Sequence, residues 1–99
     1  MLNLDLAIVI VSWNVRGLLE ACLTSVYEGL QGSNLRGEVW VVDNASTDGS
    51  AELVRERFPQ ARLMANETNV GFAAANNQAL RAMGFPSAGP HELPRYVLL

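Results

Sequence analysis

Lysine is absent from this sequence of 99 residues, and all seven basic residues are arginines. The absence excludes a GxxxxGK[ST] phosphate-binding loop and a Schiff-base lysine, because both need the lysine amino group. Ten acidic residues outnumber the basic ones, and the formal net charge is −3. Without a basic run, the composition gives no support for binding to nucleic acid. No GxGxxG motif follows the first apolar run, which argues against a dinucleotide-binding dehydrogenase.

Cysteine and histidine occur once each, as Cys22 and His91. A single cysteine excludes an internal disulfide and any metal site built from several cysteines. Cys22 lies among apolar positions at helical spacing, which favours a small buried core residue over a reactive thiol. His91 falls in a predicted loop that contains proline and glycine, where we expect a solvated side chain rather than a catalytic one.

Long hydrophobic runs are also missing. The first apolar run, Leu6 to Val11, is much shorter than a membrane span, follows Asp5 and has no basic segment before it. We therefore expect neither a signal peptide nor a transmembrane helix. Apolar residues make up 49% of the chain and charged residues 17%, a balance typical of a packed globular domain. We expect one small domain, located in the cytoplasm.

Apolar residues also predict alternating strands and helices. The runs at Leu6 to Ser12 and Val39 to Val42 lack polar alternation, as is typical of parallel strands covered on both faces. Shorter strands are predicted at Ala61 to Ala65 and Arg95 to Leu99. Apolar positions at helical spacing predict three helices. The first is predicted from Leu18, Leu19, Cys22, Leu23, Val26 and Leu30, and the second from Ala51, Leu53, Val54 and Phe58. The third is predicted from Phe72, Ala75, Ala79 and Ala82 or Met83. Gly84 is predicted as the C′ residue of the third helix.

This order of elements predicts an α/β fold with a mostly parallel sheet and helices on both faces. Because the chain stops within the apolar run at Arg95 to Leu99, we interpret residues 1–99 as the N-terminal part of a longer domain. Its sheet would be truncated after the start of the fourth strand. An unpaired strand edge is a template for self-association, so we expect a dimer or larger oligomer.

The stretch EVWVVDNASTDGS at 38–50 changes abruptly from apolar to polar residues at Asp43. A buried strand would deliver this carboxylate to its carboxyl end, where ligands bind in open α/β sheets. Asp43 can accept hydrogen bonds from a base imino group or from ribose hydroxyls, or it can simply begin a turn. Asp48, beside Gly49 and Ser50, is predicted to cap or charge-stabilise the next helix rather than to contact a ligand.

Two further sets of residues are candidates for nucleotide binding. Ser12, Trp13 and Asn14 follow the first strand, on the same edge as Asp43 if the sheet is parallel. Trp13 can stack on a heterocyclic base there, or it can fill the core. The second group surrounds the start of the third helix and suits sugar hydroxyls or phosphate, with an ordinary polar loop as the alternative: Asn69, Gly71, Asn76 and Asn77.

Five stretches carry a family resemblance: VIVSWN at 9–14, LTSV at 23–26, VWVVDNASTDGS at 39–50, NVGFAAANN at 69–77 and YVLL at 96–99. In this order they resemble the N-terminal part of an inverting, nucleotide-sugar-dependent family 2 glycosyltransferase. The sequence is most similar to the rhamnosyltransferase-like branch, which builds bacterial cell-envelope polysaccharide.

The resemblance implies a GT-A fold, a three-layer Rossmann-like arrangement in which a UDP- or dTDP-sugar lies along the carboxyl edge of the strands. It implies that Trp13 stacks on the base with Val11 and Ser12 beside it, and that Asp43 bonds the base or ribose. Asn44 and Ser46 would line the same edge. The pair Asn76 and Asn77 matches a family pair that is often Arg-Asn, and the departure at Asn76 affects a contact with the diphosphate.

In this family a short acidic motif after the fourth strand binds Mn²⁺ or Mg²⁺, and a later Asp or Glu deprotonates the acceptor hydroxyl. Both would lie beyond Leu99, and no carboxylate pair is placed to hold a metal within this chain. We therefore expect a parent enzyme, in the cytoplasm or at the inner face of the membrane, that transfers a sugar to a polysaccharide or other acceptor with inversion. The chain alone is expected to be inactive. The alternatives are a non-catalytic nucleotide-binding module and a structural or interaction domain.

Overall fold

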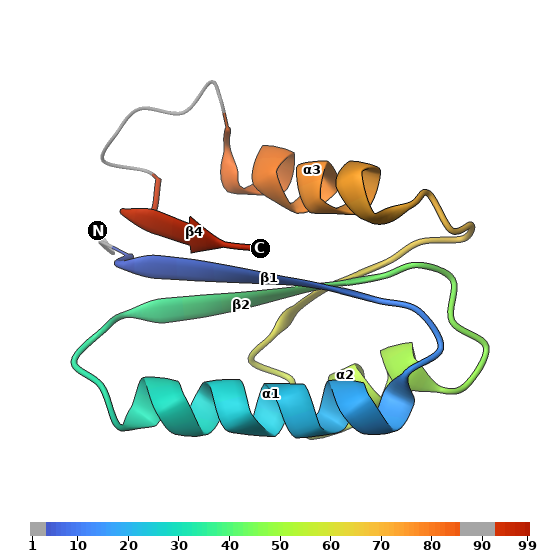
Figure 1. Cartoon of the computed structure of the whole chain (residues 1–99), viewed down its shortest axis with the longest axis horizontal. Helices are drawn as coiled ribbons and strands as arrows, with labels where there is room; N and C mark the ends of the chain where they lie inside the picture. Colours follow the sequence, from blue (N-terminus) through green and yellow to red (C-terminus); the bar gives the residue numbers. More distant parts are fainter. Residues whose placement is uncertain (1–3, 86–92) are drawn as a thin grey trace.

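The computed structural model describes residues 4–85 and 93–99, and this part of the chain folds as three layers (Figure 1). The described elements are β1 (Leu6–Ser12), α1 (Arg16–Gln31), β2 (Gly37–Asp43), α2 (Ser50–Arg57), β3 (Arg62–Ala65), α3 (Phe72–Met83) and β4 (Tyr96–Leu98). The four described strands are parallel, in the order β3-β2-β1-β4. Helices α1 and α2 cover one face of the sheet, and α3 covers the other (Figure 1). The α/β fold predicted from the sequence is confirmed.

Strand β1 fixes the alignment of the sheet. It pairs with β2 over its full length, from Leu6 opposite Gly37 to Ser12 opposite Asp43. It pairs with β4 only over its first residues, from Leu6 to Ile8. The register therefore places Ser12 and Asp43 side by side at the carboxyl ends of their strands.

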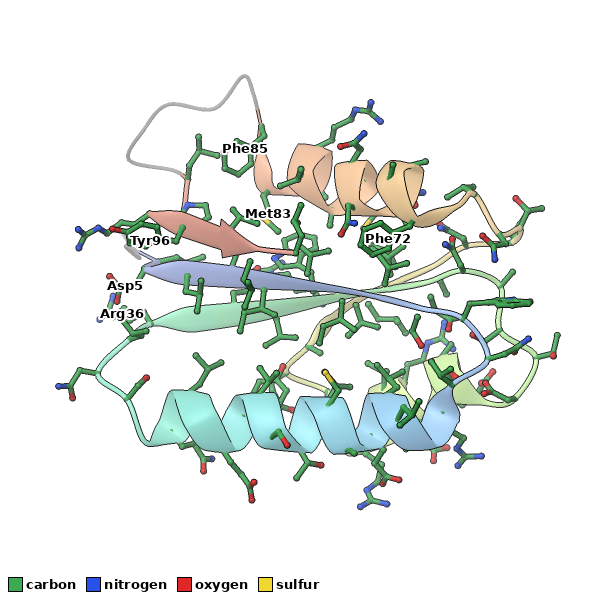
Figure 2. The ribbon with its side chains drawn as sticks, viewed as in Figure 1. Asp5, Arg36, Phe72, Met83, Phe85 and Tyr96 are labelled. Carbon is green, nitrogen blue, oxygen red and sulfur yellow. The ribbon has the colours of Figure 1, made fainter. Side chains whose placement is uncertain are left out.

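The amino edge of the sheet is closed by Asp5 and Arg36, which lie next to each other (Figure 2). The backbone N–H of Asp5 donates to the carbonyl of Arg36 at 2.9 Å. In return, the backbone N–H of Arg36 donates to Oδ2 of Asp5 at 2.9 Å. The Asp5 carboxylate at this edge therefore serves to hold the backbone through a hydrogen bond.

Hydrophobic side chains form one cluster on each face of the sheet. Since successive side chains of a strand point to opposite faces, the run from Val39 to Val42 supplies both clusters. The first cluster joins α1 and α2 to the sheet through Leu19, Leu23, Val39, Val41, Val54 and Phe58. The second joins α3 to the sheet through Val9, Trp40, Val42, Ala75 and Ala79, with Met83 packed against it beneath α3 (Figure 2).

The predicted burial of Cys22 is wrong, because Cys22 is exposed. The contact line of α1 on the sheet runs through Leu19 and Leu23, four residues apart. Leu18 and Cys22 each precede a contact residue by one position, so they lie about 100° around the helix from it. They line an open pocket together with Ile10, Val11 and Ser12 of β1, and Leu18 remains 73% exposed. The apolar stripe is wider than the surface that the sheet offers.

Phe72 also departs from the prediction that it shares a buried face with Ala75 and Ala79. Both alanines are fully buried, whereas Phe72 is 67% exposed. The absence of bulky side chains at the two alanines brings the backbone of α3 close to the sheet. The phenyl ring of Phe72, the first residue of α3, therefore lies outside the row of small side chains that packs on the sheet.

The end of α3 agrees with the prediction from the sequence. Gly84 follows α3 in a left-handed conformation, with φ of 114°, and its N–H donates to the carbonyl of Arg81. This confirms its prediction as the C′ residue, which glycine suits because it has no Cβ. His91 and most of the predicted loop Phe85 to Pro94 lie outside the described residues. Among the described helices, none has the length and apolar character needed to cross a membrane.

Candidate functional site

The loops that follow β1, β2 and β3 gather at one end of the sheet, on the right in Figure 1. We call this region the carboxyl edge and define it as residues 11–16, 43–50 and 66–72. Asn76 and Asn77 follow it in α3. The carboxyl ends of parallel strands in an open α/β sheet are the usual place for a ligand. The sequence-predicted site residues therefore fall in or beside one region.

Asp43 lies at the centre of the carboxyl edge and is 2% exposed. Its Oδ2 accepts the backbone N–H of Ser46 at 3.0 Å, and its Oδ1 accepts the hydroxyl of Ser46 at 2.6 Å. The residue therefore does begin a turn. Each carboxylate oxygen has more than one acceptor position, so the turn leaves capacity for a ligand donor. Ligand binding by Asp43 stays a prediction.

The loop after β1 is bonded to the loop after β2 through Asn14. The N–H of Asn14 donates to the Ser46 hydroxyl at 2.9 Å, and its Oδ1 accepts the N–H of Thr47 at 2.8 Å. Asn14 and Ala45 have positive φ angles of 51° and 65°. The left-handed conformation is tolerated by asparagine but costly for alanine, and it persists when surrounding bonds hold it.

Asp48 bonds to the first residues of two helices. Its Oδ2 accepts the N–H of Arg16 at 3.0 Å, and its Oδ1 accepts both the N–H and the hydroxyl of Ser50. The hydrogen bond from the Ser50 side chain is the main cause that lowers the pKa of Asp48 below its ordinary value. The N-cap residue of α2 is Gly49, with no side-chain cap. Asp48 thus supports the start of α2 as predicted, although by bonding its first residue, and it supports α1 as well.

Trp13 directly precedes Asn14 in the loop after β1 and is 56% exposed. It does not fill the core, so the core alternative is excluded. Next to it, Ser12 is buried, and its hydroxyl has no hydrogen-bond partner among the described residues. Val11 is half-buried and packs against the cluster under α3. The carboxyl edge therefore exposes the Trp13 ring to solvent next to the packed carboxyl end of β1.

Asn44 has a role that the sequence did not reveal. Its Nδ2 donates to the carbonyl of Gly71 at 3.2 Å, while its Oδ1 accepts the side chain of Asn66 at 3.0 Å and the N–H of Val70 at 3.3 Å. Asn66 in turn exchanges two amide hydrogen bonds with Gln78 of α3. Buried Asn44 therefore holds the loop between β3 and α3 against the end of β2. No local pattern marked Asn66 as the partner of Asn44, or Gln78 as the partner of Asn66.

The predicted residues around the start of α3 do not act as one group. Oδ1 of Asn69 accepts the N–H of Gly71 at 2.8 Å, and Gly71 has a positive φ of 87°. Asn76 is 4% exposed, with no partner for its Oδ1 among the described residues. Asn77 is exposed. The neighbouring asparagines therefore lie on different sides of the helix.

Comparison with known proteins identifies the family. The model of Glycosyl transferase family 2 matches residues 7–84, from β1 to the end of α3. The chain belongs to glycosyl transferase family 2. The match includes every candidate residue at the carboxyl edge and in α3. No curated protein matches the chain.

A solved structure supports the same fold. The chain is similar to a mannosyltransferase from Pyrobaculum calidifontis in complex with GDP-Man and Mn²⁺, with 31% sequence identity and a TM-score of 0.64. The similarity covers 83% of this chain but 25% of the mannosyltransferase. The chain therefore spans about a quarter of the length of this transferase, and the GT-A fold is shown for that part.

The described part of this family 2 chain does not fit a metal site. Residues 4–85 and 93–99 contain no group of three His, Cys, Asp or Glu side chains that could hold a metal ion. Asp43 and Asp48 are the carboxylates of residues 43–50, and both accept hydrogen bonds within their own loops. Divalent metals in proteins generally need several such ligands at once. The carboxyl edge can offer hydrogen bonds and aromatic stacking.

Proposed function

We propose that this family 2 glycosyltransferase chain recognises the nucleotide part of a nucleotide-sugar donor at its carboxyl edge. The observation that carries the proposal is an exposed Trp13 that directly follows Ser12, the strand partner of Asp43. The GDP-Man complex of the similar mannosyltransferase supports a nucleotide-sugar ligand of this general type. For this chain we propose a UDP- or dTDP-sugar.

Each side chain would contribute through its own chemistry. The ring of Trp13 would stack on the base, which contributes about 1–3 kcal/mol per base in single-stranded nucleic acid binding. The carboxylate of Asp43 would accept a hydrogen bond from the base or ribose, and as an acceptor-only group it would select donors. The bonds through Asn14 and Ser46 would keep the ring and carboxylate in place before the ligand arrives, which lowers the ordering cost of binding.

The parent protein would then transfer the sugar to a polysaccharide or other acceptor with inversion. Mn²⁺ or Mg²⁺ on the diphosphate and the acidic group that deprotonates the acceptor would be held by residues outside this chain. On this proposal the 99-residue chain binds nucleotide weakly and does not transfer sugar. Its self-association, cytoplasmic location and cell-envelope role stay predictions.

Calorimetric titration of the chain with UDP, dTDP and GDP, with and without Mn²⁺, tests the proposal. We expect weak binding that does not depend on Mn²⁺ and is lost in Asp43→Asn. This variant keeps the shape of the side chain but replaces one acceptor with a donor. Asp5→Asn is the matched control, because Asp5 also accepts a backbone N–H but lies at the amino edge. Absence of binding by folded protein, or full binding by Asp43→Asn, would contradict the proposal.

A further inference from the structure

Ser46 contacts both groups on which the proposed base recognition depends. Its hydroxyl donates to Oδ1 of Asp43 at 2.6 Å and accepts the N–H of Asn14 at 2.9 Å. Its own backbone N–H donates to Oδ2 of Asp43 at 3.0 Å. One residue is therefore bonded to both carboxylate oxygens and to the neighbour of Trp13.

No other described residue makes this connection. Thr47 and Asp48 also bond across to the loop after β1, but neither contacts the carboxylate of Asp43. Among the described side chains and amides, only those of Ser46 donate to that carboxylate. Among the described side chains, the Ser46 hydroxyl alone therefore contacts both the Asp43 carboxylate and the loop that carries Trp13.

We propose that Ser46 is a positioning residue, whose hydroxyl couples the orientation of the Asp43 carboxylate to the placement of Trp13. This inference rests on the proposed function, because it concerns how the same edge is kept ready for a base. The single hydroxyl proton is already used on Asp43, and one lone pair is used on Asn14. Ser46 therefore acts through its neighbours.

The backbone conformations on both sides of this linkage explain why the hydroxyl matters. Asn14 and Ala45 both have positive φ angles, at 51° and 65°. Residues in such conformations relax when the bonds that hold them are removed. Without the Ser46 hydroxyl, the N–H of Asn14 loses its partner. The segment that carries Trp13 is then held to the loop after β2 through Thr47 and Asp48, neither of which contacts the Asp43 carboxylate.

The test compares Ser46→Ala, which removes the hydroxyl, with Ser46→Thr, which keeps it. Ser33→Ala is a matched control, because the Ser33 hydroxyl also donates to a carbonyl and accepts a backbone N–H, but in the loop after α1. Two quantities are measured in the 99-residue chain. One is hydrogen exchange at the Asn14 amide without nucleotide, and the other is the Kd for the nucleoside diphosphate that binds best among UDP, dTDP and GDP.

We expect Ser46→Ala to speed exchange at Asn14 by about tenfold and to weaken nucleotide binding by about five- to tenfold. Ser46→Thr should restore both quantities to within about twofold, and Ser33→Ala should leave both unchanged within that margin. The double variant Ser46→Ala and Trp13→Ala should lose less affinity than the sum of the single losses, because both act on one contact. Ser46→Cys, which keeps the bulk with a weaker donor, replaces Ser46→Ala if the latter does not fold.

Unchanged exchange at Asn14, or unchanged nucleotide affinity, in folded Ser46→Ala would overturn the inference. A purely stabilising role for Ser46 would lower the unfolding temperature and speed exchange at protected amides throughout the chain, but it would leave the nucleotide affinity of the folded chain unmoved. If the wild-type chain binds none of the three nucleotides, the proposed function fails by itself. The exchange rate at Asn14 then still decides whether Ser46 couples the two loops.

Discussion

The carboxylate of Asp48 accepts the backbone N–H of Arg16 at 3.0 Å, although 32 positions separate the two residues in the sequence. Arg16 is the first residue of α1, and Asp48 also bonds Ser50, the first residue of α2. A negative charge at two helix N-termini is favourable for both helices. This single side chain therefore fixes how the helices on one face of the sheet begin at the carboxyl edge.

Acid should weaken the fold through Asp48. Its pKa is lower in the folded chain than its ordinary value of 3.8, mainly because the Ser50 side chain bonds the charged form. A lowered pKa contributes stability that is present above the unfolded value and is lost as the pH falls through the folded value, so the loss begins below about pH 5. Asp48→Asn should therefore lower the unfolding temperature at pH 7 and show a smaller further drop on acidification. Glu67→Gln removes an exposed carboxylate and serves as the control. An unfolding temperature that depends on pH equally in Asp48→Asn and in wild type would contradict this prediction.

Glycine at position 49 should be required for its backbone conformation. Gly49 has a φ of 86°, and a Cβ there would lie 3.1 Å from Nη1 of Arg16. Gly49→Ala should destabilise the chain by about 1–2 kcal/mol in urea unfolding. Gly29 lies within α1 with open space around it, so Gly29→Ala should stabilise by about 0.5–1 kcal/mol. A change in the free energy of unfolding with the same sign for both substitutions would be evidence against the left-handed conformation at Gly49.

Two leucines of α1 should differ sharply in their contribution to stability. Leu23 is fully buried in the cluster against β2, while Leu18 is largely exposed. Leu23→Ala should cost about 2–5 kcal/mol, because it removes buried methyl groups and leaves a cavity. Leu18→Ala should stay within about 0.5 kcal/mol of wild type. Urea unfolding of both variants checks the placement of α1, which a large loss from Leu18→Ala would refute.

The thiol of Cys22 should react in the native state. Because Cys22 is exposed, a water-soluble disulfide reagent should label it without denaturant, at a rate close to that in the unfolded chain. Cys22→Ser should abolish labelling and change stability by less than about 0.5 kcal/mol. Labelling that appears only in denaturant would restore the buried position that the apolar pattern predicts.

The sequence predicted the elements well where a local pattern determines them. The apolar run Leu6 to Ser12 coincides with β1, and Gly84 ends α3 in the left-handed conformation expected for glycine. The carboxyl end of β2 at Asp43 follows from the same kind of evidence, a sudden change of polarity. Because parallel strands align their carboxyl ends, these local predictions also placed Ser12 and Asp43 on one edge.

Features that depend on distant partners could not be predicted in the same way. Helical spacing gives the direction of the apolar stripe of α1, but not the width of the sheet beneath it, so Cys22 was misplaced. Asn44 resembles its neighbours as a polar edge residue, yet its bonds run to Asn66, Val70 and Gly71. The exposure of Trp13 likewise depends on how the loop after β1 is tied to Ser46 and Thr47.

Nucleotide binding at the carboxyl edge can be located by titrating the chain with UDP, dTDP and GDP and recording its amide and indole NMR shifts. A different cavity, of about 200 Å³, lies on the α3 side of the sheet and is lined by Glu38, Trp40, Arg62 and Met83, among others. We expect shifts at the indole of Trp13 and the amides of Asn14 and Ser46, with the indole of Trp40 unmoved. Shifts confined to Trp40 and its neighbours, or no shifts in the folded chain, would contradict binding at the carboxyl edge.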